Sequence, residues 1–162
     1  MKSYLTQSLK SYLDQLSAHS PVPGGGSAAA LAAALGTALI SMAAQYALKR
    51  NLPRAVEKSI QRVLKNSERI RSKLQTLVDK DAQAYLRVVV TRKASQSDRK
   101  AALRQAGKVP LEVARLCYEA LDLIPPLVEK GSPFLLSDLG VAGEFLFAAF
   151  KAAMINVRVN QE

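Results

Sequence analysis

A carboxylate on the apolar side of a long predicted helix is the first candidate for chemistry in this sequence. Residues 54–92 repeat apolar side chains at spacings of three and four, which predicts a helix with one buried side. Asp81 lies on that side, whereas Asp79 lies off it. Burial of a carboxyl group costs stability and raises its pKa, so the group can exchange protons nearer neutral pH. We predict that Asp81 is catalytic; the alternative is a structural aspartate satisfied by hydrogen bonds.

A run of glycines offers a second kind of chemistry, the binding of an anionic or carbonyl group. Gly24, Gly25 and Gly26 stand before Ser27 and an alanine-rich run. Glycines tolerate positive φ and let a ligand approach the backbone, and Ser27 is predicted to cap the helix that follows. The N–H groups of a helix N-terminus attract negative charge, so these four residues are predicted to bind substrate. A flexible linker into a buried helix is the alternative. No Gly-Lys-Ser/Thr follows and no strand precedes, which excludes the two common nucleotide-binding glycine motifs.

The composition bears on metal binding, disulfide formation, cellular location and nucleic-acid binding. With one histidine and one cysteine, the chain is not expected to bind a metal. The single cysteine, Cys117, rules out a disulfide framework and favours a cytoplasmic location. The net charge of +10 attracts polyanions, and residues 54–73 carry a basic stripe. No aromatic residues alternate with that stripe, which favours a solvated surface over a nucleic-acid interface.

The elements that must position these residues are all helices. Helices are predicted over residues 2–17, 27–50 and 54–92, then from a capping box at 95–98 to about 107, from Pro110 to the Pro125–Pro126 pair, and from 137 to about 160. No segment has a strand pattern, so the chain is predicted to form one all-α domain over residues 1–162. Residues 27–46 lack charge but are mostly alanine, which favours a central bundle helix over a membrane span.

Five segments of the sequence occur in an order that resembles a known family. They are Gly24 to Ser27, Asp79 to Ala82, Val109 to Ala114, the Ser137-Asp138 pair, and Asn156 to Asn160. Together they resemble the cyclodeaminase/cyclohydrolase family, which includes the C-terminal domain of formiminotransferase-cyclodeaminase and methenyltetrahydrofolate cyclohydrolase. The resemblance implies an elongated antiparallel helical bundle that forms a homodimer and binds a folate as substrate, without a further cofactor and without a membrane. It also nominates Asp81 as the catalytic aspartate.

The resemblance implies a reaction as well as a fold. The first expectation is a hydrolase of one-carbon metabolism that converts 5,10-methenyltetrahydrofolate to 10-formyltetrahydrofolate. Cyclodeamination of 5-formiminotetrahydrofolate is the alternative, ranked second because the sequence contains no formiminotransferase segment. Asp81 would act as general base and acid, and the substrate-binding set would comprise Gly24, Gly25, Gly26, Ser27, Ser137, Asp138, Asn156 and Asn160. A catalytically inactive, basic helical binding protein is the expectation from another class.

Overall fold

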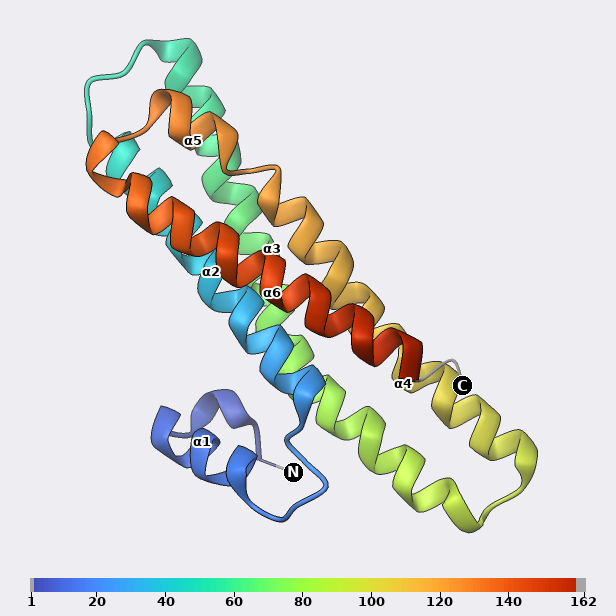
Figure 1. The fold of residues 1–162 in the computed structure, drawn as a ribbon. Coiled ribbons are helices and arrows are strands. Elements are labelled where there is room, and N and C mark those ends of the chain that lie inside the picture. The colour runs from blue at the N-terminus through green and yellow to red at the C-terminus, as the bar shows by residue number, and fades with distance from the viewer. Residues whose placement is uncertain (1, 160–162) are drawn as a thin grey trace.

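The computed structural model describes residues 2–159, which form helices and loops without a strand in that range. Four long helices, α2 (Gly25–Leu48), α3 (Arg54–Val90), α4 (Gln96–Leu121) and α6 (Leu136–Val159), lie side by side in an elongated antiparallel bundle (Figure 1). The shorter elements are η1 (Tyr4–Thr6), α1 (Leu9–Ser17), η2 (Thr91–Lys93), α5 (Pro125–Lys130) and η3 (Pro133–Leu135). The predicted all-α bundle is confirmed.

Helix α2 is the central helix of the bundle, as its uncharged and alanine-rich sequence predicts. It packs against α3, α4 and α6, and small side chains let these neighbours come close. A methyl group on Gly36 would lie 2.9 Å from the backbone oxygen of Ala142 in α6, so glycine sets the closest approach of the two helices. The hydroxyl of Ser41 donates to the buried hydroxyl of Ser67 over 2.9 Å and ties α2 to α3.

Helix α4 is longer than the sequence predicts. Ser95 caps it as expected, since the N–H of Asp98 donates to the Ser95 hydroxyl over 3.1 Å. The predicted end near Gly107 and restart at Pro110 are wrong, because one helix runs through both. Pro110 removes one backbone hydrogen bond, but its ring is fully buried, and packing on both sides carries the helix past it. The predicted interruption at Pro125 is confirmed, since α4 ends before it and α5 begins there.

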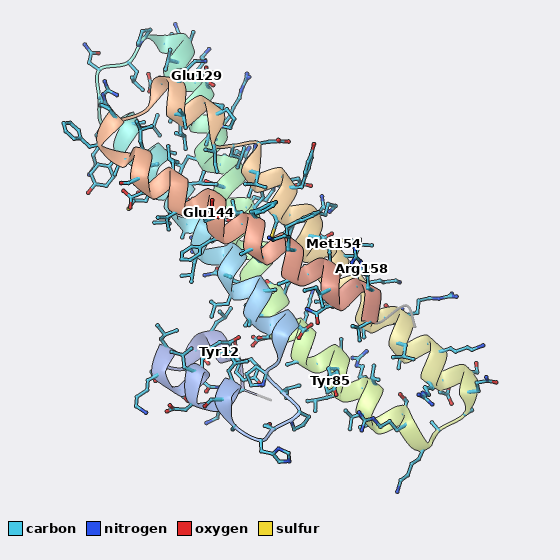
Figure 2. All side chains as sticks on the ribbon, viewed as in Figure 1. Tyr12, Tyr85, Glu129, Glu144, Met154 and Arg158 are labelled. Atoms are coloured by element: carbon cyan, nitrogen blue, oxygen red, sulfur yellow. The ribbon has the colours of Figure 1, made fainter. Side chains whose placement is uncertain are left out.

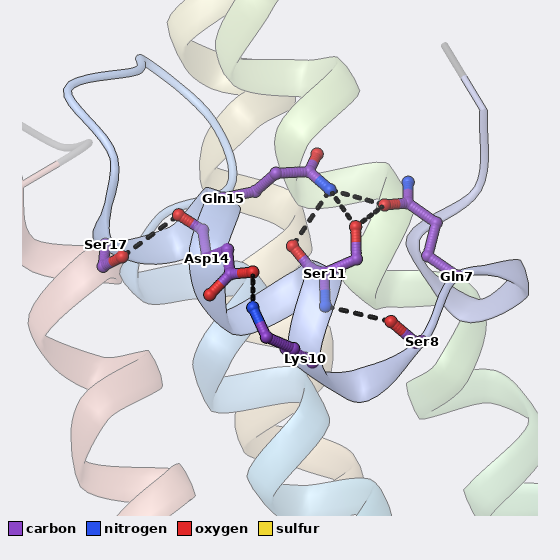
Figure 3. Close-up of polar contacts among 7 residues, drawn as sticks. All are labelled: Gln7, Ser8, Lys10, Ser11, Asp14, Gln15 and Ser17. Atoms are coloured by element: carbon purple, nitrogen blue, oxygen red, sulfur yellow. Dashed lines mark hydrogen bonds and ion pairs between the residues drawn. The ribbon is translucent and has the colours of Figure 1, made fainter.

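The first residues form an arm (residues 3–17) beside the start of α2, not the single helix that the sequence predicts (Figure 1). The helix predicted over residues 2–17 is interrupted at Ser8. The Ser8 hydroxyl accepts a hydrogen bond from the N–H of Ser11, so Ser8 is the N-cap of α1 (Figure 3). Asp79 of α3 holds the other end of the arm. Its carboxylate accepts from the Tyr4 N–H over 2.8 Å and from the Ser3 hydroxyl over 2.5 Å.

We expect Asp79→Ala to release the arm without unfolding the bundle. Both hydrogen bonds end on a charged group, and their loss should cost about 1–3 kcal/mol of arm docking. Hydrogen exchange should therefore quicken over residues 3–17 and stay slow in α2. The matched control is Asp14→Ala in the same arm, which breaks an exposed ion pair with Lys10 (Figure 3) and should cost no more than about 1 kcal/mol. Equal exchange in the two variants would show that Asp79 does not anchor the arm.

Candidate active site

A pocket of about 300 Å³ lies where four helices converge at one end of the bundle. The first turn of α2 forms one wall, α3 contributes Asp81 and Tyr85, α4 contributes Ala106, and the end of α6 contributes Asn156. Residues separated by more than a hundred positions thus meet because α2, α3, α4 and α6 are antiparallel. Tyr12 of the arm and Tyr85 of α3 lie at this same end of the molecule (Figure 2).

Two of the three pocket glycines, Gly25 and Gly26, belong to the helix and not to a loop. Helix α2 begins at Gly25, with Gly24 as a cap that has no side chain to offer. The expectation of positive φ is wrong, since no glycine among residues 2–159 has one. What Gly26 provides is space: a Cβ there would lie 2.0 Å from an oxygen of Asp81. The absence of a side chain therefore lets the carboxylate of α3 reach the first turn of α2.

The prediction that Ser27 caps α2 is wrong. It is not the N-cap, and it is completely buried, so its hydroxyl does not face the pocket. That hydroxyl lies 3.1 Å from the phenol oxygen of Tyr12. The backbone N–H of Ser27 instead faces the carboxylate of Asp81 and lowers its pKa. Asp81 thus supplies, from another helix, the anionic cap that α2 lacks.

The electrostatics of Asp81 suit a group that exchanges protons. Burial raises the pKa of its carboxyl above the ordinary value, and the Ser27 N–H acts in the opposite direction with the smaller effect. No ion-pair partner of Asp81 occurs among residues 2–159. A salt-bridged structural aspartate would have such a partner, so the surroundings of Asp81 favour the catalytic interpretation.

Asn156 is the other predicted site residue that the fold brings to the pocket. Its side-chain NH₂ donates to the Ala152 backbone oxygen over 3.1 Å, which leaves its amide oxygen as a free acceptor among the described contacts. Its amide atoms lie opposite Gly25, where an added methyl group would sit 3.9 Å from them. Asn160, predicted beside it, lies outside the residues that the structure describes.

Ser137 and Asp138 do not share this pocket within one chain. They belong to the first turn of α6, whereas Asn156 belongs to its last turns. At about 1.5 Å per residue, Asp138 and Asn156 are about 27 Å apart along the helix. Figure 1 shows these two ends of α6 at opposite sides of the bundle. The predicted role of Ser137 and Asp138 in substrate binding therefore has no support from the geometry of a single chain.

Two further features lack the chemistry of a reaction centre. An open groove of about 680 Å³ lies between α3 and α4, but its charged groups are the cations Lys80 and Arg87, with no carboxylate. Cys117 is fully buried and burial raises its pKa to about 12, so it is a packing residue and not a thiolate nucleophile. Residues 2–159 hold no cluster of three potential metal ligands.

Sequence reasoning missed the roles of two residues around the site. Tyr12 reads as one more apolar position of an amphipathic helix, and nothing in the sequence indicates that its hydroxyl meets Ser27. Asp79 lies off the buried stripe, so the apolar pattern gives it no role, yet it anchors the arm. Tyr85 lies one helical turn after Asp81 on the predicted apolar stripe, and the structure leaves it 40% exposed at the pocket.

Comparison with known proteins agrees with this geometry. The family model described as formiminotransferase-cyclodeaminase matches residues 8–162. The methenyltetrahydrofolate cyclohydrolase of Methylorubrum extorquens is 34% identical over 95% of this chain and 79% of that protein. The formimidoyltransferase-cyclodeaminase of Mus musculus is 33% identical over 98% of this chain, which spans only 31% of the mouse protein.

A solved structure shows the same fold. The formiminotetrahydrofolate cyclodeaminase of Thermotoga maritima superposes with a TM-score of 0.93 at 30% identity, over 97% of this chain and 79% of that one. The family match, the identities and the shared bundle point the same way. The chain belongs to the formiminotransferase-cyclodeaminase family.

Proposed function

We propose that this protein hydrolyses 5,10-methenyltetrahydrofolate to 10-formyltetrahydrofolate in one-carbon metabolism. The observation that carries the proposal is Asp81, a half-buried carboxylate with a raised pKa and no cationic partner among the described residues, placed in a pocket beside a helix N-terminus. The similarity to the cyclohydrolase of Methylorubrum extorquens, which spans most of both chains, supports the choice of substrate.

The chemistry of this substrate needs little beyond one carboxyl group. The reacting carbon lies between two nitrogens in a cation, and an unpaired carboxylate stabilises that cation on binding. Asp81 takes a proton from water as the oxygen attacks the carbon. It then gives a proton to the ring nitrogen as the bond from that nitrogen to the carbon breaks, which leaves the formyl group on the other nitrogen and releases one net proton.

The other pocket residues can contact parts of such a ligand away from its reacting carbon. Free N–H groups in the first turn of α2 can donate to a carbonyl or carboxylate oxygen of the substrate. The Asn156 amide oxygen can accept from an N–H of the pterin ring. Tyr85 is 40% exposed and offers an aromatic face beside Asp81.

Cyclodeamination of 5-formiminotetrahydrofolate is the second candidate, favoured by the fold shared with the Thermotoga maritima cyclodeaminase. This reaction closes the folate ring that the hydrolysis opens, and it uses the same carboxyl group. Asp81 would accept the proton of the attacking folate nitrogen and deliver a proton to the departing amine, so that the ring closes and ammonia leaves.

The test is to give each substrate to the purified protein. Loss of the near-ultraviolet absorbance of methenyltetrahydrofolate, faster than in buffer alone, would support hydrolysis. Gain of that absorbance from formiminotetrahydrofolate, with release of ammonia, would support cyclodeamination. If neither absorbance changes beyond the buffer rate, the proposed function is wrong and the basic binding protein becomes the better account.

We also propose that a second copy of the chain covers one side of α6. Two segments are long and apolar enough to span a membrane, α2 and residues Pro133–Val159. Much of α2 is buried in the bundle, but only 22% of the apolar window in the second segment is. Four of its exposed apolar side chains share one helical face: Val141, Phe145, Ile155 and Val159. Such a face is costly to leave in water, and a symmetric dimer would bury it.

We expect light scattering at micromolar concentration to report a dimer, and Val141→Glu to convert it to a monomer. Val141 lies on that apolar face, and burying a charge there without a partner strongly disfavours contact. Val128→Glu on α5, an equally exposed valine off that face, should leave the dimer intact. A monomeric parent protein that sediments with lipid vesicles would contradict the dimer and assign the face to a membrane. A cytoplasmic location stays a prediction from the single cysteine.

A further inference from the structure

Ser27 connects the candidate catalytic carboxylate to the N-terminal arm. It is completely buried in the first turn of α2, and its two polar groups point to two different elements. Its backbone N–H is close enough to the Asp81 carboxylate of α3 to lower the pKa of that group. Its hydroxyl lies 3.1 Å from the hydroxyl of Tyr12 in the arm. A contact that holds Ser27 in place therefore also orients the N–H group that faces Asp81.

Tyr12 is itself buried and packs against Tyr4. It is only 4% exposed, and its ring meets that of Tyr4 edge-on, with ring centres 5.7 Å apart at 81°. Tyr4 is held in turn by the bond from its N–H to Asp79, two positions before Asp81 on α3. A continuous series of contacts thus runs from α3 through the arm to α2 and back to α3, with Asp79 and Asp81 at its two ends.

We propose that Tyr12 is a positioning residue for Asp81. Its hydroxyl orients Ser27 and, with it, the first turn of α2, so that the Ser27 N–H points at the carboxylate. The proposal rests on Asp81 being the acid–base group of the proposed function, but its geometry does not depend on which folate is the substrate.

The hydroxyl of Tyr12 is the part of the side chain that packing alone does not require. Phenylalanine would fill the same volume and keep the edge-on contact with Tyr4. Among the described residues, the bond to Ser27 is the hydrogen bond that joins the arm to α2. Burial raises the pKa of the Tyr12 hydroxyl, and the charge of Asp81 adds a smaller effect in the same direction, so the two groups are close enough to influence each other. A buried hydroxyl retained at this point has a directional role.

The experiment is Tyr12→Phe, followed by titration of Asp81. Carboxyl carbon resonances of ¹³C-labelled aspartates are recorded against pH, and Asp81→Asn assigns the relevant signal. The Ser27 N–H lowers the pKa of Asp81, so a less well aimed N–H should let that pKa rise further. The acid limb of the turnover profile should move to higher pH with it, and kcat at neutral pH should fall about three- to tenfold while KM changes little.

Two variants make the test specific. Ser27→Ala removes the hydroxyl that Tyr12 holds but keeps the backbone N–H, so it should reproduce the Tyr12→Phe shift. The double variant should shift no further than either single one, because both break the same bond. Tyr4→Phe is the matched control: the same change in the same arm, at a hydroxyl without a described hydrogen bond, should leave the titration of Asp81 unchanged.

The outcomes separate this inference from the proposed function. If the parent protein turns over a folate and Tyr12→Phe moves neither the titration of Asp81 nor the acid limb, Tyr12 only packs and the inference is wrong. If the parent protein turns over neither folate, the proposed function fails, and the resonance titration still decides whether Tyr12 positions Asp81. Equal shifts in Tyr12→Phe and Tyr4→Phe would also overturn it, since loosening of the arm would then be the cause.

Discussion

Asp81→Asn should lower folate turnover by about 10²- to 10⁴-fold, the range for loss of a general acid–base group. Asparagine has nearly the same shape and can still accept a hydrogen bond from the Ser27 N–H, so the pocket should keep its form. Substrate should bind more weakly as well, because the cationic folate loses its only described counter-charge. Single-turnover measurements at saturating substrate separate these two losses.

The stability of the same variant should move in the opposite direction. Burial raises the pKa of Asp81 in the folded chain above that of an unfolded aspartate, about 3.9. Its favourable contribution is therefore complete below the unfolded pKa and is lost as pH rises through the folded pKa. Asparagine undergoes no such loss, so at neutral pH the variant should melt at or above the parent temperature.

Asp122→Asn is the control for both measurements. Asp122 is exposed at the end of α4, and the same chemical change there should affect neither turnover nor melting. A lower melting temperature for Asp81→Asn with parent-like turnover would show that Asp81 is only the cap of α2. The catalyst would then have to be sought elsewhere.

Gly26→Ala should abolish most activity through a single methyl group. The new Cβ would lie 2.0 Å from one oxygen of Asp81, 2.5 Å from its carboxyl carbon and 2.8 Å from the other oxygen. Such distances do not occur, so the carboxylate must swing away or the first turn of α2 must shift. Misplacement of a catalytic group by about 1 Å costs about 10²-fold in rate, and we expect at least that loss.

Gly140→Ala provides the control for this substitution. Gly140 is also helical, but a methyl group there meets no atom within 4 Å. It should leave turnover unchanged and raise stability by about 0.5–1 kcal/mol, because alanine favours the helix. If Gly26→Ala keeps parent turnover, Asp81 does not need its observed position, and its assignment as catalyst fails.

Periodic apolar patterns were enough to predict the bundle. The stripe on α3 gave both the helix and the exceptional Asp81, because a helix repeats its buried face in sequence. The continuity of α4 could not be predicted in this way. Gly107 and Pro110 locally disfavour a helix, and packing against helices distant in the sequence outweighs them. The single helix predicted over residues 2–17 is wrong for a related reason: Asp79, which anchors the arm, lies on another helix.

The role of the glycines shows the same limit within the site. A run of three glycines indicates backbone freedom or close approach, and only the folded arrangement distinguishes them. At Gly26 it is close approach, to a side chain more than fifty positions away. By contrast, the helix predicted from residue 137 to about 160 already separates Ser137 and Asp138 from Asn156 by its own length, so the sequence itself argued against a shared site within one chain.

The anchoring of the arm has a consequence for the order in which the molecule folds. Ser3 and the aspartate that holds it are 76 positions apart in sequence. Contacts of such long range form late, after the hairpin of α2 and α3 has already paired. The arm leaves the ribosome before α3, yet it can dock only after residue 79 has followed. In refolding we therefore expect helical content to return before activity, because the Tyr12 contact with Ser27 forms only when the arm docks.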